Sequence, residues 1–286
     1  MSTFAHVNHV QLHYYDRPGD EPALILLPGL TVNARIFDGL VAAGLGNGRR
    51  VIAVDMRGRG LSEKPDSGYH MRDHADDVIA LMDHLGLERA IPVGHSFGGL
   101  LAFCLAAWHP ARIPEIVTID ASVLLVTERT RELIKSSLDR LEMTLPSMEA
   151  YLETMKQMPY LDGFWSEAME AYYKGDVRQN PDGTVQPLAS AQAIAQTVDL
   201  QFELDWEAVV KAVEQPVLLL NALGPYGPPG APVLMPSDIA EKTVTSLKRC
   251  TYRVIKGNHI TMIFGQGAQQ IVSAIDDFLA STTGAA

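Results

Sequence analysis

Short apolar runs alternate with amphipathic segments along most of the chain, and this alternation restricts the possible folds more than any other feature. The runs are of strand length and occupy residues 23–27, 51–54, 90–93, 115–119, 216–220 and 251–255. The segments between the runs have helical periodicity. In one of them, for example, Val78, Ile79, Met82 and Leu85 recur at steps of three and four residues. Such alternation predicts an α/β protein with a mostly parallel sheet flanked by helices.

One long segment, residues 123–212, interrupts the alternation. It has helical periodicity punctuated by turn residues, and no pattern typical of a strand. Because it lies between two expected sheet strands, we interpret it as a helical cap over the sheet. The expected organisation is a core made of residues 1–122 and 213–286, with a cap formed by residues 123–212.

Composition narrows the functional classes. The chain of 286 residues has 34 acidic and 23 basic side chains and a net charge of −11, which argues against binding to nucleic acids and to anionic membrane surfaces. No apolar stretch approaches the roughly 20 residues of a membrane span, and the N-terminus lacks a signal-peptide pattern. Cys104 and Cys250 cannot form a disulfide framework. We therefore expect a cytoplasmic protein that acts on a small molecule, with homodimer formation left open.

The motif Gly94-His95-Ser96-Phe97-Gly98 lies between an expected strand and an expected helix. This is the setting of a nucleophile elbow, in which small residues leave room for a sharp turn and a serine stands at a helix N-terminus. An ordinary glycine-rich turn is the alternative, and the strand and helix on either side argue against it. Ser96 is the candidate nucleophile.

A serine nucleophile needs a base, and His259 is the best candidate. It follows the last apolar run, 251–255, in the tripeptide Gly257-Asn258-His259. Catalytic groups collect at the carboxyl ends of parallel strands. The remaining histidines lie in the elbow, in the N-terminal strands or on helices.

On these motifs the chain resembles the α/β-hydrolases, in particular the capped esterases, dehalogenases and carbon–carbon hydrolases of that family. Residues 26–30, Leu-Leu-Pro-Gly-Leu, match the oxyanion loop of the family. Residues 55–62, Asp-Met-Arg-Gly-Arg-Gly-Leu-Ser, match its D-x-R-G-x-G-x-S turn. The elbow, the insertion and Gly-Asn-His then follow in the order of the family.

The resemblance implies an oxyanion hole formed by the backbone N–H groups of Leu30 and Phe97. Pro28 stands where the family usually has histidine, but a hole made of backbone donors can survive this change. The resemblance also implies a structural role for Asp55 and Arg57, which would brace the turn at 55–62.

The position of the triad acid departs from the usual pattern. Most relatives carry it just after the strand that follows the cap, but residues 221–230 contain no carboxylate. The next acid, Asp238, is better interpreted as a helix N-cap. Asp120, at the end of the run 115–119, is the alternative.

Some relatives carry the acid at the strand end that Asp120 occupies. They include haloalkane dehalogenases, cofactor-free dioxygenases and the (E)-2-(acetamidomethylene)succinate hydrolases, which the chain also resembles at residues 183–190. We therefore assign the acid to Asp120, with a turn-capping role for Asp120, or an acid at Glu203 or Asp205, left as alternatives.

A serine, a histidine and an aspartate with two N–H donors suit acyl transfer without a metal or organic cofactor. We expect a serine carboxylesterase-type hydrolase, with a lactone or an amide as other substrates. A dehalogenase or epoxide hydrolase of this fold attacks with a carboxylate, so Ser96 argues against both. Carbon–carbon bond hydrolysis, cofactor-free dioxygenation and a ligand-binding receptor remain alternatives.

The cap holds a group of thioether and aromatic side chains that could form an adaptable apolar wall. The expected substrate-binding residues are Met143, Met155, Met158, Tyr160, Phe164 and Trp165. Packing of the cap onto the sheet is the other interpretation of the same stripe. Lys156 is the only cation in residues 141–173, which favours a neutral, fairly apolar substrate.

Four side chains near one helix start, His70, Asp73, His74 and Asp77, have a spacing that could suggest a metal site. The segment matches a stretch that lies outside the pocket in the family. A solvated helix start is the interpretation we favour.

Overall fold

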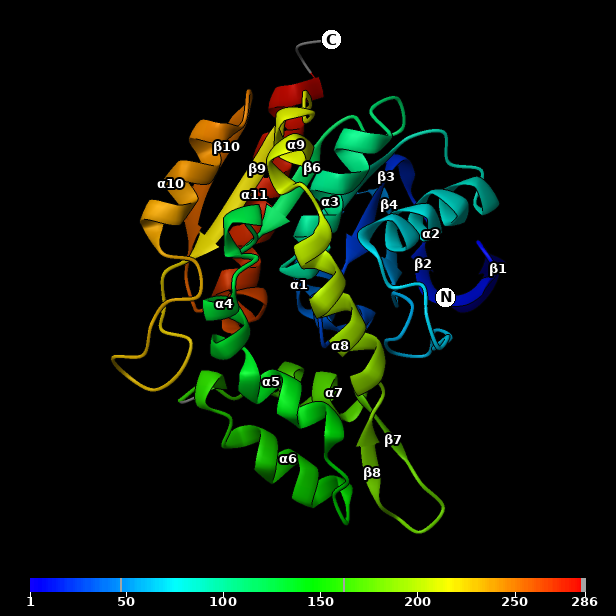
Figure 1. Cartoon of the computed structure of the whole chain (residues 1–286), viewed down its shortest axis with the longest axis vertical. Helices are drawn as coiled ribbons and strands as arrows, with labels where there is room; N and C mark the ends of the chain where they lie inside the picture. Colours follow the sequence, from blue (N-terminus) through cyan, green and yellow to red (C-terminus); the bar gives the residue numbers. More distant parts are fainter. Residues whose placement is uncertain (47, 162, 284–286) are drawn as a thin grey trace.

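The expected strands all form, and they belong to one mixed sheet. The computed structural model describes residues 1–46, 48–161 and 163–283. The strands of the sheet are β1 (Ser2–Val7), β2 (Val10–Arg17), β3 (Asp20–Leu27), β4 (Arg49–Val54), β5 (Ala90–His95), β6 (Ile116–Ile119), β9 (Val217–Ala222) and β10 (Cys250–Ile255). Their order is β1-β2-β4-β3-β5-β6-β9-β10 (Figure 1). β2 pairs antiparallel with both β1 and β4, and the remaining neighbours in this order, from β4 through β3 to β10, pair parallel. The predicted α/β fold is therefore confirmed.

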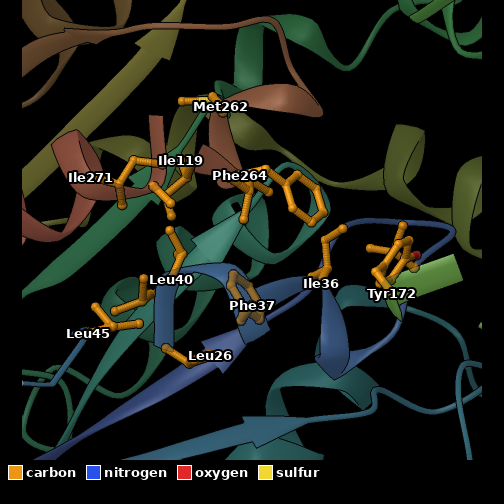
Figure 2. Packing of buried hydrophobic residues seen from close by; sticks show 14 of the residues in the cluster. Leu26, Ile36, Phe37, Leu40, Leu45, Ile119, Tyr172, Met262, Phe264 and Ile271 are labelled. Atoms are coloured by element: carbon orange, nitrogen blue, oxygen red, sulfur yellow. The ribbon is translucent and has the colours of Figure 1, made fainter. Parts of the chain in front are cut away.

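Helices cover both faces of the sheet. Those of the core are η1 (Ala34–Phe37), α1 (Asp38–Ala42), α2 (Met71–His84), α3 (Phe97–Trp108), α10 (Ser237–Ser246), η6 (Thr261–Ile263) and α11 (Gly265–Thr283). α2 and α3 pack on the face that Ile25 of β3 presents, and α1 and α11 pack on the opposite face with Leu26. Figure 2 shows this second face, where Leu40 and Ile271 meet the strand residues. Both faces of the sheet are therefore buried, which explains why the strands are continuous apolar runs in the sequence.

Most of the insertion forms the lower, green part of Figure 1, whereas its last segment, drawn in yellow, runs up to the top of the view. Its helices are η2 (Val123–Leu125), α4 (Glu128–Leu133), α5 (Lys135–Asp139), η3 (Arg140–Glu142), α6 (Met148–Lys156), η4 (Pro159–Leu161), α7 (Glu167–Lys174), α8 (Ala191–Leu200), η5 (Gln201–Glu203) and α9 (Trp206–Lys211). None of the helices in the described ranges is long and apolar enough to cross a membrane.

The expectation that the insertion contains no strand is wrong. β7 (Val177–Gln179) and β8 (Val185–Pro187) form an antiparallel hairpin. The turn between them is closed by the backbone N–H of Thr184, which donates to Asp182 Oδ1 at 3.0 Å. Strands of three residues are too short to display the alternation by which strands are predicted.

The cap and the sheet share their packing. Tyr151 and Met155 of α6 belong to the same apolar cluster as Leu26 of β3. At the other end of the insertion, Val209 and Val210 of α9 are buried in the cluster that contains α3. The last helix of the expected cap therefore lies in the helical layer of the core.

A buried ion pair also fastens the cap to the loop that follows β3. Arg140 of η3 pairs with Asp176, and its guanidinium donates to the Thr31 carbonyl at 2.9 Å. Asn33 Nδ2 donates to Asp176 Oδ1 at 3.0 Å. The expected oxyanion loop is thus held against the cap by charged and polar groups.

Candidate active site

Ser96 stands on a strained turn between β5 and α3. Its backbone has φ 54° and ψ −117°, a conformation that residues with a side chain rarely adopt. A Cβ on Gly94 would lie 2.1 Å from the Gly98 carbonyl oxygen, and a Cβ on Gly98 would lie 1.9 Å from the Leu27 carbonyl oxygen. The two glycines are therefore required by close backbone approach, as the elbow motif predicts.

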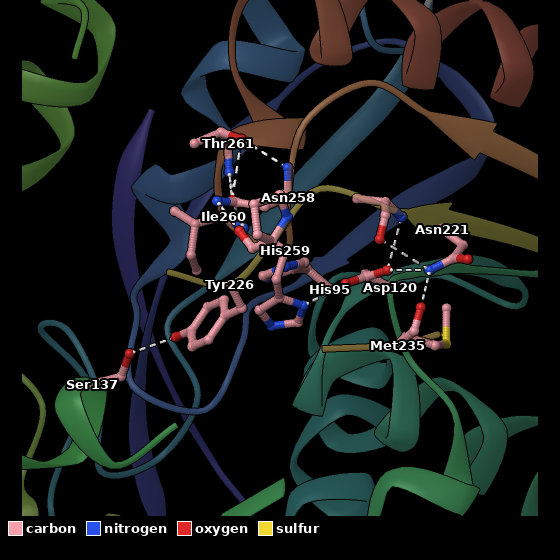
Figure 3. Close-up of polar contacts among 12 residues, drawn as sticks. His95, Asp120, Ser137, Asn221, Tyr226, Met235, Asn258, His259, Ile260 and Thr261 are labelled. Atoms are coloured by element: carbon pink, nitrogen blue, oxygen red, sulfur yellow. Dashed lines mark hydrogen bonds and ion pairs between the residues drawn. The ribbon is translucent and has the colours of Figure 1, made fainter. Parts of the chain in front are cut away.

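His259 lies after β10 and faces Asp120, which follows β6. The ring Nδ1–H donates to Asp120 Oδ2 at 2.7 Å, and both side chains are buried (Figure 3). Because a carboxylate only accepts, this bond places a proton on Nδ1 and leaves Nε2 able to accept one. The structure thus brings together the predicted base and the predicted acid.

The other candidate acids lie elsewhere. Glu203 is exposed, and Asp205 caps α9 by accepting a hydrogen bond from the Ala208 N–H at 3.0 Å. Asp238 is not the N-cap of α10 but lies in its first turn, where it pairs with Lys242 at 3.3 Å.

Asn221, at the end of β9, holds the second oxygen of Asp120. Its Nδ2 donates to Asp120 Oδ1 at 2.8 Å, and the Ala222 backbone N–H donates to the same oxygen at 2.9 Å. Tyr252 in turn donates its hydroxyl to Asn221 Oδ1 at 2.9 Å. Asn221 was not among the residues predicted to form the site, although an amide directly after the apolar run 216–220 is a signal that could have found it.

The groups expected to meet a substrate are free. In the part of the chain that the structure describes, neither Ser96 Oγ nor His259 Nε2 has a hydrogen-bond partner. The backbone N–H groups of Leu30 and Phe97 also have no partner within the described residues. Phe97 begins α3, so its N–H is one of the donors that a helix start leaves unpaired. These four groups can all engage a bound carbonyl compound.

Two aromatic rings pack against the His259 imidazole. The His95 ring lies 4.6 Å away, centroid to centroid, and its Nε2–H donates to the His259 carbonyl at 2.9 Å. Burial lowers the pKa of His95 well below its usual range, so this neighbour stays neutral. Tyr226 meets the imidazole edge-on at 5.8 Å and is bonded through its hydroxyl to Ser137 of α5 at 2.8 Å. The cap thereby helps to fix the candidate base (Figure 3).

A pocket of about 80 Å³ opens beside Ser96. Its apolar lining comes from the expected oxyanion loop, the turn at Ser96, the segment after β6 and the end of α8. The lining residues are Leu30, Ser96, Phe97, Leu100, Asp120, Ala121, Ser122, Leu125, Val126, Thr127, Thr130, Arg131, Ile134, Val198, Gln201, Phe202 and Leu234. None of the six cap residues expected to bind substrate is among them.

The structure places those six residues in the packing between cap and sheet. Met155, Met158 and Tyr160 are buried in the shared apolar cluster, and Met143, Phe164 and Trp165 pack against it. Trp165 also stacks on Tyr173 at 5.6 Å. Their expected substrate-binding role is therefore not supported. An apolar stripe at helical spacing indicates burial but does not say which surface it is buried against.

The turn at 55–62 is braced as expected. Asp55 accepts hydrogen bonds from the backbone N–H groups of Ala34 and Leu61 at 2.7 and 2.9 Å. Arg57 forms a bidentate ion pair with Asp77, in which Nη2 donates to Oδ1 at 2.5 Å and Nε donates to Oδ2 at 2.6 Å. Asp55 therefore ties the turn to η1, and Arg57 ties it to α2.

The expectation of a solvated helix start at residues 70–77 is wrong for two of its four side chains. Asp77 is buried in its pair with Arg57, and His74 is fully buried with its ring 5.1 Å from that of Phe97. Neither ring nitrogen of His74 has a hydrogen-bond partner among the described residues. No group of three or more His, Cys, Asp or Glu side chains in the described ranges could hold a metal ion.

The chain is similar in sequence and in fold to known hydrolases. The profile of the alpha/beta hydrolase fold family matches residues 22–265, so the chain belongs to the α/β-hydrolase fold family. A 2-(acetamidomethylene)succinate hydrolase from Mesorhizobium japonicum is 33% identical over 207 residues, 71% of each chain. The crystal structure of an E-2-(acetamidomethylene)succinate hydrolase matches with a TM-score of 0.84 and 25% identity, over 98% of this chain and 99% of that one. A 2-hydroxymuconate semialdehyde hydrolase from Pseudomonas sp. is 41% identical over 96 residues, 33% of each chain. The expected likeness to the first of these hydrolases is confirmed.

Proposed function

We propose that the protein is a serine hydrolase that cleaves a carboxylic ester of a small, neutral molecule through an acyl-enzyme intermediate. One observation carries the proposal: His259 is fixed by Asp120 through Nδ1 and has a free Nε2, at the same sheet edge as the strained Ser96 turn. In a triad of this kind the acid orients the imidazole and stabilises its charged form, and the imidazole activates the serine.

The reaction follows from the free groups of the site. Ser96 Oγ attacks the ester carbonyl carbon while His259 Nε2 takes the hydroxyl proton. The carbonyl oxygen becomes an oxyanion that accepts hydrogen bonds from the N–H groups of Leu30 and Phe97. The imidazolium then protonates the leaving alcohol, and the acyl group stays on Ser96. Water, deprotonated by His259, then attacks the acyl carbonyl carbon. The bond to Ser96 Oγ breaks, the imidazolium returns its proton to Oγ, and the acid leaves.

The pocket supports a neutral substrate with a short acyl group. Its lining contains one cation, Arg131, which is paired with Asp199 at 3.1 Å. Arg140 is held in its buried pair with Asp176 and is not available to a substrate carboxylate. A volume of about 80 Å³ is small beside the roughly 300 Å³ or more of typical ligand pockets. A lactone fits the same chemistry.

Amide hydrolysis is the second candidate. It is favoured by the likeness to the 2-(acetamidomethylene)succinate hydrolase from M. japonicum. The same nucleophile, base and oxyanion donors would serve, with an amine as the leaving group. Cleavage of 2-(acetamidomethylene)succinate itself, compared with cleavage of a p-nitrophenyl ester, separates the two candidates.

The deciding experiment is the steady-state hydrolysis of p-nitrophenyl acetate, butyrate and octanoate by the wild type, Ser96→Ala and Ser122→Ala. Ser122 also lines the pocket, but its hydroxyl is bonded to Thr243 at 2.6 Å, so it is a matched control. We expect turnover that Ser96→Ala abolishes and Ser122→Ala keeps, with a mass increase of one acyl group on Ser96 after rapid quenching.

Absence of turnover, or turnover that survives Ser96→Ala, would refute the proposal. Oxygen uptake with a heteroaromatic substrate would then point to cofactor-free dioxygenation, and cleavage of a vinylogous diketone to carbon–carbon hydrolysis. Saturable binding with no more than a single turnover would indicate a receptor.

A further inference from the structure

Arg59 is a fully buried cation. Its exposed fraction is 0%, and no acidic side chain in the described residues forms an ion pair with it. Burial, aided by the charge of Arg57, lowers the pKa of Arg59 to about 9, which leaves it charged at neutral pH. Burying an unpaired charge costs stability, so its presence calls for a compensating role.

The guanidinium joins the two residues that carry the oxyanion donors. Nε donates to the Leu30 carbonyl at 3.0 Å, and Cζ lies 4.8 Å from the centroid of the Phe97 ring. Nη1 donates to the Arg57 carbonyl at 2.7 Å, and Nη2 donates to Thr197 Oγ1 of α8 at 3.4 Å. Arg59 thus contacts the oxyanion loop, the first residue of the elbow helix and a cap helix that also lines the pocket.

We propose that Arg59 is a positioning residue for the oxyanion hole, holding Leu30 and Phe97 in place and setting a fixed positive charge beside the developing oxyanion. The inference rests on the proposed function. A charge in a water-excluded site acts strongly on a charge that develops nearby and needs no reorganisation during the reaction. Arg140 provides the contrast, because a buried arginine with only a structural role is paired with an acid, here Asp176.

The test compares Arg59→Met and Arg59→Lys with Arg72→Met. Arg72 also lies over an aromatic ring, 3.8 Å from the centroid of Trp108, but it does not line the pocket. For each variant we would measure kcat and KM for a p-nitrophenyl ester and the inhibition constant of a trifluoromethyl ketone, whose adduct with Ser96 mimics the oxyanion. Thermal unfolding would establish that each variant is folded.

Loss of one direct oxyanion donor costs about 10²–10³ in kcat, so we expect Arg59→Met to lower kcat by about 10–100-fold. KM should change less than about threefold, because the ground-state carbonyl carries little charge. The trifluoromethyl ketone should bind more weakly by a factor close to the loss in kcat. Arg59→Lys should recover part of both losses, and Arg72→Met should behave as the wild type.

A folded Arg59→Met with kcat and inhibitor affinity within about twofold of wild type would overturn the inference. If that variant does not fold, Arg59→Gln, which keeps a donor and removes the charge, replaces it under the same criterion. These outcomes concern Arg59 alone. Failure of the proposed function would instead be seen in the wild type, as turnover that does not depend on Ser96.

Discussion

Asp120 and Asn221 meet at the carboxyl ends of the neighbouring parallel strands β6 and β9, where Asn221 Nδ2 donates to Asp120 Oδ1 at 2.8 Å. The strand end at which the family usually carries the acid therefore carries an amide, which holds the candidate acid Asp120 at the end of the neighbouring strand β6. With the Ala222 N–H on Oδ1 and His259 on Oδ2, both oxygens of Asp120 are engaged. The carboxylate has one defined orientation toward the imidazole.

Asp120→Asn should lower kcat by about 10³–10⁴, because an amide in place of the carboxylate no longer selects the Nδ1–H tautomer or stabilises the imidazolium. Steady-state ester hydrolysis measures the effect. Glu203→Gln is the control, since Glu203 is an exposed candidate acid without contact to His259, and it should stay near wild type. Activity of Asp120→Asn within a few-fold of wild type would show that another residue is the acid.

Asn221→Ala should reduce kcat by about 10–100-fold, less than Asp120→Asn, because the carboxyl group of Asp120 stays in place and loses only one of its two orienting donors on Oδ1. Tyr252→Phe removes only the outer hydrogen bond to Asn221 and should stay within about threefold of wild type. An Asn221→Ala variant that is as active as Tyr252→Phe would mean that the Ala222 N–H alone orients Asp120.

Whether the pocket beside Ser96 binds the acyl chain of the substrate can be tested by filling it with a larger side chain. Val198→Phe introduces a larger side chain into the lining, so hydrolysis of p-nitrophenyl octanoate should fall at least about tenfold more than that of the acetate. Met158→Leu, in the packing between cap and sheet, should leave the ratio of the two rates unchanged. A change in chain-length preference in Met158→Leu but not in Val198→Phe would restore the substrate-binding role first expected for the cap methionines.

His74 should make the fold sensitive to acid. Burial, together with the charges of Arg59 and Arg57, holds the pKa of His74 well below its usual range. The unfolded chain therefore binds the proton more readily than the folded protein does. As a result, the free energy of unfolding does not depend on His74 well above pH of about 6.5 and decreases as the pH falls below that value. The slope is up to about 1.4 kcal/mol per pH unit for one histidine.

Urea unfolding at pH 7.5 and 5.5 measures this dependence. His74→Leu should lose less stability on acidification than wild type, by about 1 kcal/mol, while His84→Leu, an exposed position on the same helix, should lose as much as wild type. The His74 variant will keep some acid sensitivity, because burial lowers the pKa of His95 in the same direction. Equal losses in both variants would contradict the role of His74.

The fold and the elbow could be predicted because their signals are local. Glycines at 94 and 98 are required by contacts with backbone only a few residues away or on the adjacent strand, and a dry strand needs a continuous apolar run. His259 could be predicted for a similar reason, since its place after the last strand puts it at the carboxyl edge of the sheet. Asp120 needed the family resemblance, because an acid after a strand also suits a turn.

The hairpin β7–β8, the burial of His74 and the lining of the pocket could not be predicted in this way. Each depends on which surface of an element meets another element that is distant in the sequence. Met155 and Val198 illustrate the point: both are apolar and on cap helices, yet Met155 packs against the core and Val198 lines the pocket. Nothing in their immediate sequence distinguishes them.

The sequence by itself therefore determined the α/β architecture, the sharp turn at Ser96 and the candidate base, because strand-length apolar runs and the glycine spacing of the turn can each be recognised within a few residues of sequence. Only the tertiary structure decided that Asn221 holds Asp120, that the buried Arg59 contacts both Leu30 and Phe97, and that the pocket is lined by α4 and α8 and not by the cap methionines. These relationships join residues as much as 138 positions apart, as in the Arg59–Thr197 contact. They arise when helices and strands pack, which fixes the distances and the burial on which hydrogen bonds and charges depend.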